Sequence, residues 1–179
     1  GQLDIDNTEE KSAPQKVLLP ENETLKQIVT DEHSIFCITD SGKLYAWGEN
    51  SLGQLGIGNT ENQSTPQEVR LPEKEVSKQI VADSNSIFCI TNSGKPYAWG
   101  FNYNGQLGIG DTEKPHYHTP QKVLIPENEV PKEIVTDNGS IFCTTNSGKL
   151  YAWGKNSFGQ LGIGNAKNQC VPKEVTLPD

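Results

Sequence analysis

The chain has 179 residues, of which 33% are hydrophobic, 17 are glycine and 11 are proline. This composition suits short strands joined by many turns and argues against long amphipathic helices. The formal net charge of −8 does not provide the positive field that attracts phosphate backbones or anionic lipid, so direct nucleic-acid binding is not expected. The sequence contains no apolar run long enough to span a membrane and no basic-then-apolar leader.

A tetrapeptide recurs along the chain at a nearly constant interval. Tyr-Ala-Trp-Gly occurs at residues 45–48, 97–100 and 151–154, with spacings of 52 and 54 residues. The motifs Gly-Gln-Leu, Ser-Ile-Phe-Cys and Asn/Asp-Ser-Gly-Lys recur in the same register. Self-similarity at such a period is typical of repeat architectures. The two extra residues of the longer unit fall within 114–118, where we expect a loop.

The first half of each unit predicts a β-hairpin. Residues 34–39 place apolar side chains on both alternating faces, which is typical of a strand covered on both sides, and we predict a buried inner strand here. Residues 40–43 have turn chemistry, and residues 44–47 follow with aromatic and apolar side chains.

The second half of each unit is richer in turn residues. The glycines of 53–58 permit close backbone approach or positive φ, and Pro66 suits an edge strand over 66–69. Residues 72–78 are polar and predicted to form a loop, which leads through 79–81 to the next inner strand. Four short strands per unit result.

A sheet of four short strands cannot bury both faces alone, whereas radially stacked sheets bury each face against a neighbour. We therefore predict a β-propeller in which the tryptophans pack between blades. These are Trp47, Trp99 and Trp153.

Three cysteines occupy one position of the repeat. Equivalent positions in successive blades lie about a blade apart and point the same way, so Cys37, Cys89 and Cys143 are predicted to be buried free thiols. A reducing compartment, the cytoplasm, is the expected location.

The string Gly-Lys-Leu-Tyr-Ala-Trp-Gly-Glu-Asn-Ser-Leu-Gly-Gln-Leu-Gly-Ile-Gly at 42–58 resembles the RCC1 (regulator of chromosome condensation) repeat, and its counterparts cover nearly the whole chain. The resemblance implies four-stranded blades, usually seven in a ring, and a family that includes guanine-nucleotide exchange factors for Ran-type small GTPases. The near-identical repeats and the Asn/Lys/Glu/Ile-rich composition are also similar to RCC1-repeat effectors that intracellular bacteria deliver into the host cytosol, where they act on Ran- or Rab-type GTPases.

The predicted fold class is all-β, an RCC1-like propeller with about three complete four-stranded blades plus a half blade. The blades are placed at 34–71, 86–125 and 140–177, and residues 1–19 are the outer half of a preceding blade, all in one domain over 1–179. This is an open arc or a fragment of a seven-bladed ring. Because open strand edges invite pairing, self-association is one expectation.

The run before each predicted inner strand is the first candidate site. In RCC1 proteins it resembles Gly-x-x-His-Ser/Thr, whereas here aspartate replaces the glycine three times and one histidine remains. One interpretation is an acidic recognition rim for a basic protein surface; the alternative is solvated turn residues. The candidate partner-binding residues are Asp31, Glu32, His33, Asp83, Asn85, Asp137 and Asn138.

The second candidate site is the longer loop, where His116, Tyr117 and His118 offer aromatic contact area. The alternative is an unremarkable surface loop. A metal site is not expected, because no nearby cysteine or carboxylate set completes the ligands. Asp4-Ile5-Asp6-Asn7 is interpreted as a degenerate repeat and not as a calcium loop.

The leading functional hypothesis is a scaffold that binds or regulates a Ran- or Rab-like small GTPase. No nucleophile, base and orienting residue recur together, so neither a catalytic centre nor a cofactor is expected. The most that is expected as an activity is nucleotide exchange. No large insertion supplies the wedge on which the family's exchange activity depends. The alternatives are an adaptor or inhibitor of a non-GTPase protein and, third, a lectin-like ligand binder.

Overall fold

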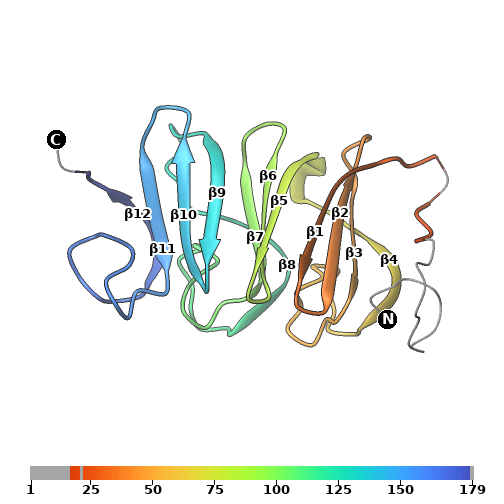
Figure 1. Cartoon of the computed structure of the whole chain (residues 1–179), viewed down its shortest axis with the longest axis horizontal. Coiled ribbons are helices and arrows are strands. Elements are labelled where there is room, and N and C mark those ends of the chain that lie inside the picture. The colour runs from red at the N-terminus through yellow and green to blue at the C-terminus, as the bar shows by residue number, and fades with distance from the viewer. Residues whose placement is uncertain (1–16, 21, 178–179) are drawn as a thin grey trace.

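The computed structural model describes residues 17–20 and 22–177. Within them, three four-stranded antiparallel sheets stand side by side in chain order, like successive blades (Figure 1). The first sheet contains β1 (Leu25–Asp31), β2 (Ser34–Thr39), β3 (Leu44–Gly48) and β4 (Gln63–Val69). After the short 3-10 helix η1 (Pro72–Lys74), the second sheet contains β5 (Ser77–Asp83), β6 (Ser86–Thr91), β7 (Pro96–Phe101) and β8 (His116–Lys122). The third contains β9 (Pro131–Asp137), β10 (Ser140–Thr145), β11 (Leu150–Gly154) and β12 (Gln169–Val175). The all-β propeller prediction is confirmed.

The innermost strand of each sheet is the first one, because β1 contacts β5 and β5 contacts β9 across the sheet boundaries. The prediction that 34–39 is the inner strand is wrong: these residues form β2, the second strand. Strand β1 was not recognised because its side chains alternate between exposed and half-buried, so it lacks a continuous apolar run. The predicted ranges 34–71, 86–125 and 140–177 therefore leave out the first strand of each sheet.

The half blade predicted for 1–19 falls almost entirely outside the described residues, and 17–19 carry no strand. The predicted hairpin is present, with Ser34 paired to Gly48 and Ile35 to Trp47. The same register recurs in the second and third sheets.

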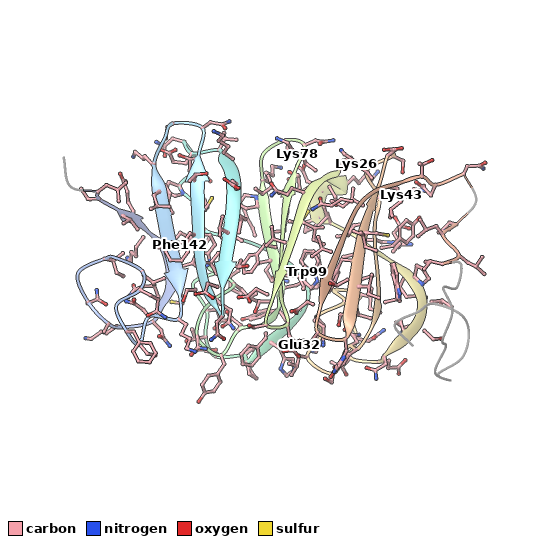
Figure 2. All side chains as sticks on the ribbon, in the orientation of Figure 1. Lys26, Glu32, Lys43, Lys78, Trp99 and Phe142 are labelled. Atoms are coloured by element: carbon pink, nitrogen blue, oxygen red, sulfur yellow. The ribbon has the colours of Figure 1, made fainter. Side chains whose placement is uncertain are left out.

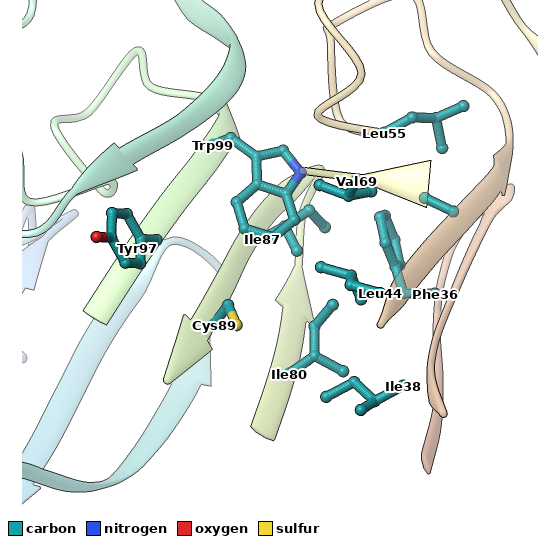
Figure 3. Packing of buried hydrophobic residues seen from close by; sticks show 11 residues of the cluster. Phe36, Ile38, Leu44, Leu55, Val69, Ile80, Ile87, Cys89, Tyr97 and Trp99 are labelled. Atoms are coloured by element: carbon teal, nitrogen blue, oxygen red, sulfur yellow. The ribbon is translucent and has the colours of Figure 1, made fainter. Parts of the chain in front are cut away.

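The hydrophobic core lies between neighbouring sheets (Figure 3). Phe36 and Leu44 of the first sheet pack with Ile87, Cys89 and Trp99 of the second. A second cluster repeats the arrangement between the second and third sheets around Trp153. Trp99 and Trp153 are 0% exposed and Trp47 is 1% exposed, so the predicted burial of the three indoles is confirmed.

The glycine-rich loop after β7 closes over the tryptophan of the next sheet. The indole nitrogen Nε1 of Trp153 donates a hydrogen bond to the carbonyl oxygen of Gln106 at 2.8 Å. Gly108 has φ +68°, and a Cβ built on it would lie 2.6 Å from Nε1 of Trp153. The preceding boundary repeats the bond, from Trp99 to the carbonyl of Gln54 at 2.9 Å. Close backbone approach therefore requires glycine here, as predicted.

The prediction that these thiols are buried and form no disulfide is confirmed for Cys37, Cys89 and Cys143. Burial raises the pKa of the Cys89 and Cys143 thiols to about 12. The outward face of the third sheet is less covered than its counterparts, since Phe142 is half-buried while Phe36 and Phe88 are 0% exposed. In the part of the chain that the structure describes, no helix is long and apolar enough to cross a membrane.

Candidate protein-binding rim

The turns between the first two strands of all three sheets lie along the same edge of the arc, the lower edge in Figure 1. Backbone hydrogen bonds hold the loop after the third strand beside each turn. The amides of Glu49, Phe101 and Lys155 donate to the carbonyls of the adjacent turns at 3.0, 2.9 and 2.8 Å. We call this surface the lower rim. It comprises residues 31–34, 49–53, 83–86, 101–105, 137–140 and 155–159.

The lower-rim turns are two-residue hairpin connections with left-handed backbone. Glu32 has φ 44°, Asn85 has φ 63° and Asn138 has φ 46°. Turns of this kind require positive φ, which asparagine tolerates and which costs energy for glutamate. The residues thus have a conformational role in addition to any role in recognition.

Two of the candidate carboxylates connect neighbouring sheets. Asp31 accepts a hydrogen bond from the backbone N–H of Asn85 at 2.6 Å, and Asp83 accepts one from the N–H of Gly139 at 2.8 Å. Both aspartates are half-buried, and burial raises the pKa of Asp31 against the opposing effect of its bond to Asn85. Asp137, the equivalent residue of the third sheet, is exposed.

The Asn85 side chain also belongs to the scaffold. Its Oδ1 accepts a hydrogen bond from Nε2 of Gln54 at 3.1 Å, and Gln54 is 0% exposed. The candidates with exposed side chains are therefore fewer than the sequence predicted. They are Glu32, His33, Asp137 and Asn138.

His116, Tyr117 and His118 do not lie on a loop but form the start of β8. The insertion is accommodated just before them, and Tyr117 pairs with Gly100. The Tyr117 hydroxyl donates to the Asp111 carboxylate, which lowers the pKa of Asp111. Burial and this bond raise the pKa of Tyr117 to about 12. The Tyr117 hydroxyl is thus committed within the fold.

The sequence reasoning missed several aromatic side chains on the lower rim. Tyr103 is 74% exposed and Phe158 is 88% exposed. The Tyr103 ring stacks on Phe101 with centroids 6.4 Å apart and an interplanar angle of 10°. The signal that could have found Phe101 and Tyr103 is divergence between repeats: the first sheet carries Glu49 and a serine at these two positions.

Charged side chains lie at both edges of the arc. Glu32 lies at the lower edge, whereas Lys26, Lys43 and Lys78 lie at the upper edge (Figure 2). Lys43 is paired with Glu23 at 2.7 Å, and bonds from Lys43 and Ser41 lower the pKa of Glu23 to about 2. Equivalent lysine–glutamate pairs occur in the second and third sheets. The upper edge therefore repeats a structural ion pair.

The lower rim, by contrast, is mainly acidic. Its carboxylates, with those of the adjoining loop before β8, outnumber its lysines. They are Asp31, Glu32, Glu49, Asp83, Asp111, Glu113 and Asp137, against Lys114 and Lys155. Among the described residues, no group of three or more His, Cys, Asp or Glu side chains is arranged to hold a metal ion.

Comparison with known proteins identifies relatives. UVR8, the ultraviolet-B receptor of Arabidopsis thaliana, is 32% identical over 179 residues, which make up 100% of this chain and 40% of the receptor. The human X-linked retinitis pigmentosa GTPase regulator is 37% identical over 147 residues, or 82% of this chain and 14% of the regulator. The chain spans less than half the length of either relative.

Solved structures show the same fold. Prp20p from Saccharomyces cerevisiae, studied for its binding to Gsp1p and histones, superposes with a TM-score of 0.76 at 22% identity over 86% of this chain and 38% of Prp20p. The family model for the regulator of chromosome condensation (RCC1) repeat matches residues 41–90, 93–136 and 147–179. Together with the stacked four-stranded sheets, this match shows that the chain belongs to the RCC1 repeat family.

Proposed function

We propose that this chain is a protein-binding propeller segment that binds or regulates a small GTPase, Ran-like or Rab-like, through the lower rim. One observation carries the proposal: the bonds between sheets repeat from one sheet to the next, while the exposed lower-rim side chains differ between sheets. Contacts common to all sheets serve the fold, so side chains that vary on one exposed edge are available for recognition. Relatives named as a GTPase regulator or studied for Gsp1p binding support the partner class.

In this proposal the chain contributes binding to the GTPase. Acceleration of nucleotide exchange is a separate activity, which the release of labelled GDP measures. An adaptor or inhibitor of a non-GTPase protein would use the same surface, and a lectin-like function has less support because the tryptophans are buried in packing. The buried cysteines, which form no disulfide, favour a reducing compartment such as the cytoplasm, including a host cytosol.

The test is affinity for a panel of Ran- and Rab-type GTPases in nucleotide-free, GDP-bound and GTP-bound forms, followed by release of labelled GDP. The informative variant is Glu32→Lys with Asp137→Lys, because both side chains are exposed and neither is bonded to a neighbouring sheet. The matched control is Glu127→Lys, which reverses an exposed charge outside the lower rim.

We expect the double variant to bind the GTPase more weakly and the control to bind like the unmodified chain. The affinity of the unmodified chain should fall as the salt concentration rises. Binding without faster GDP release would assign an adaptor or effector role. Absence of binding to every member of the panel would refute the GTPase proposal.

A further inference from the structure

The three sheets provide an internal control for what the fold requires. Their hairpin registers and tryptophan positions coincide, so a residue type confined to one sheet at an equivalent position is not needed for folding. At one place, the second sheet carries aromatic side chains that the other two sheets lack. We call these four residues the aromatic ladder: Phe101, Tyr103, His116 and His118. The first sheet has Glu49, Ser51, Asn62 and Ser64 there, and the third has Lys155, Ser157, Asn168 and Cys170.

The aromatic ladder consists of two stacked pairs of rings on neighbouring strands. Tyr103 stacks on Phe101, and Phe101 pairs across the strands with His116. The His116 ring stacks on that of His118, with centroids 5.1 Å apart and an interplanar angle of 21°. Tyr103 is 74% exposed, and the other three side chains are half-buried. The second sheet thus presents two stacked pairs of aromatic rings, one at the lower rim and one beside it on β8.

Because of the inserted residues, the side chain at position 116 does not have to accept the hydrogen bond that its counterparts accept in the other two sheets. In the first sheet, the side-chain oxygen of Asn62 accepts a hydrogen bond from the backbone N–H of Asn50 at 2.9 Å. The third sheet repeats this bond at the equivalent residues. In the second sheet, the backbone N–H of Asn102 donates instead to the backbone carbonyl of Pro115 at 2.7 Å. A backbone oxygen from the longer loop thereby replaces the asparagine side chain, and an aromatic residue occupies the position.

The surroundings of the aromatic ladder favour a cation. Asn102, which lies between Phe101 and Tyr103 in sequence, donates a side-chain hydrogen bond to the backbone carbonyl of Asp111, whose carboxylate accepts one from the backbone N–H of Glu113. The carboxylate of Asp111, together with the acidic side chains of the lower rim, would repel the phosphates of a nucleotide whose base stacked on the rings. Arginine combines stacking on aromatic faces with hydrogen bonds to carboxylates.

We propose that the aromatic ladder is a binding site for an arginine-bearing basic segment of a protein partner. The guanidinium group packs on the exposed faces of Phe101 and Tyr103 and is attracted by the lower-rim carboxylates. This inference rests on the proposed function only in that a protein partner docks on the lower rim, and it specifies the chemistry of that partner.

The test measures the affinity of the full chain for a synthetic nonapeptide with three arginines spaced by glycine and serine. Comparison peptides replace arginine by citrulline, which removes the charge, or by leucine. The informative variant is Phe101→Glu with Tyr103→Ser, which installs the residues found in the first sheet. Because the added carboxylate favours a cation by charge alone, weaker binding isolates the contribution of the rings. The control, Phe158→Leu, likewise installs the first-sheet residue at an exposed aromatic position.

We expect the arginine peptide to bind more tightly than both comparison peptides and the double variant to lose roughly five- to tenfold in affinity, with Phe158→Leu unchanged. Tyr103→Ser alone, at an exposed position, gives a smaller loss in the same direction and covers the case in which the double variant does not fold. Equal binding of the citrulline or leucine peptide, or equal loss in the control, would overturn the inference. GTPase binding without preference for the arginine peptide overturns this inference and leaves the proposed function standing, whereas arginine-dependent peptide binding without GTPase binding does the reverse.

Discussion

Replacing Gly108 by alanine places a methyl group against the indole of Trp153. The added Cβ would lie 2.6 Å from Nε1 and 2.9 Å from Cδ1 of that ring, well inside contact distance. The loop or the tryptophan must then move, which strains the hydrogen bond from Trp153 to Gln106. Two costs add: overpacking of about 1–3 kcal/mol and a weakened hydrogen bond of about 1 kcal/mol.

A third cost comes from the backbone and can be measured separately. Gly108 has φ +68°, where an L-residue costs roughly 1–2 kcal/mol. Gly162 occupies the same loop position after β11 with φ +69°, but the nearest atom to its built Cβ is Cγ1 of Val175 at 3.5 Å. Gly162→Ala therefore reports the backbone cost without the clash.

The assay is chemical denaturation followed by tryptophan fluorescence and by far-ultraviolet circular dichroism, which together reveal any uncoupled unfolding of single sheets. We expect the free energy of unfolding to fall by about 1–2 kcal/mol for Gly162→Ala. For Gly108→Ala the expected loss is about 3–6 kcal/mol. Equal losses in the two variants would refute the argument that the loop packs on the tryptophan of the next sheet.

Three further predictions follow from the contacts. Asp83→Ala removes the acceptor for the N–H of Gly139 and should lower the unfolding free energy by about 1–3 kcal/mol, whereas the exposed Asp137→Ala should change it by less than about 0.5 kcal/mol. Because burial raises the pKa of Cys89 from 9.0 to about 12, its stabilising contribution is complete below pH 9.0 and declines as pH rises from there towards 12; denaturation midpoints across this window test it, and Cys89→Ser should flatten the decline. Trp99→Ala should cost about 3–5 kcal/mol in the same denaturation assay, and a loss below about 1 kcal/mol would contradict its role between sheets.

Local patterns in the sequence were sufficient for the repeat, the β2–β3 hairpin and the buried side chains. Turn residues and the alternation of apolar side chains are properties of neighbouring residues, and recurrence in three units makes their reading robust. Trp47, Trp99 and Trp153 were assigned to blade packing for this reason.

Strand β1 shows where local reasoning failed. Its side chains are at most half-buried, so its sequence resembles a polar connection and its strand conformation depends on pairing with β2. The side chain of Gln27 adds a bond to the backbone carbonyl of Ile80 in the next sheet at 3.1 Å. Strand β2 follows β1 through a two-residue turn, but Ile80 lies 53 residues from Gln27, and no local pattern encodes such a contact.

The candidate site divides in the same way. The sequence by itself located the repeated turns and the acidic residues in them, because both recur at the repeat period. Only the tertiary structure showed that Asp31 and Asp83 bind the next sheet while Glu32 faces solvent, since hydrogen bonds across 54 or 56 residues depend on how the sheets stack. It also brought Phe101 beside His116 through pairing of β7 with β8, which converts scattered aromatic residues into one surface.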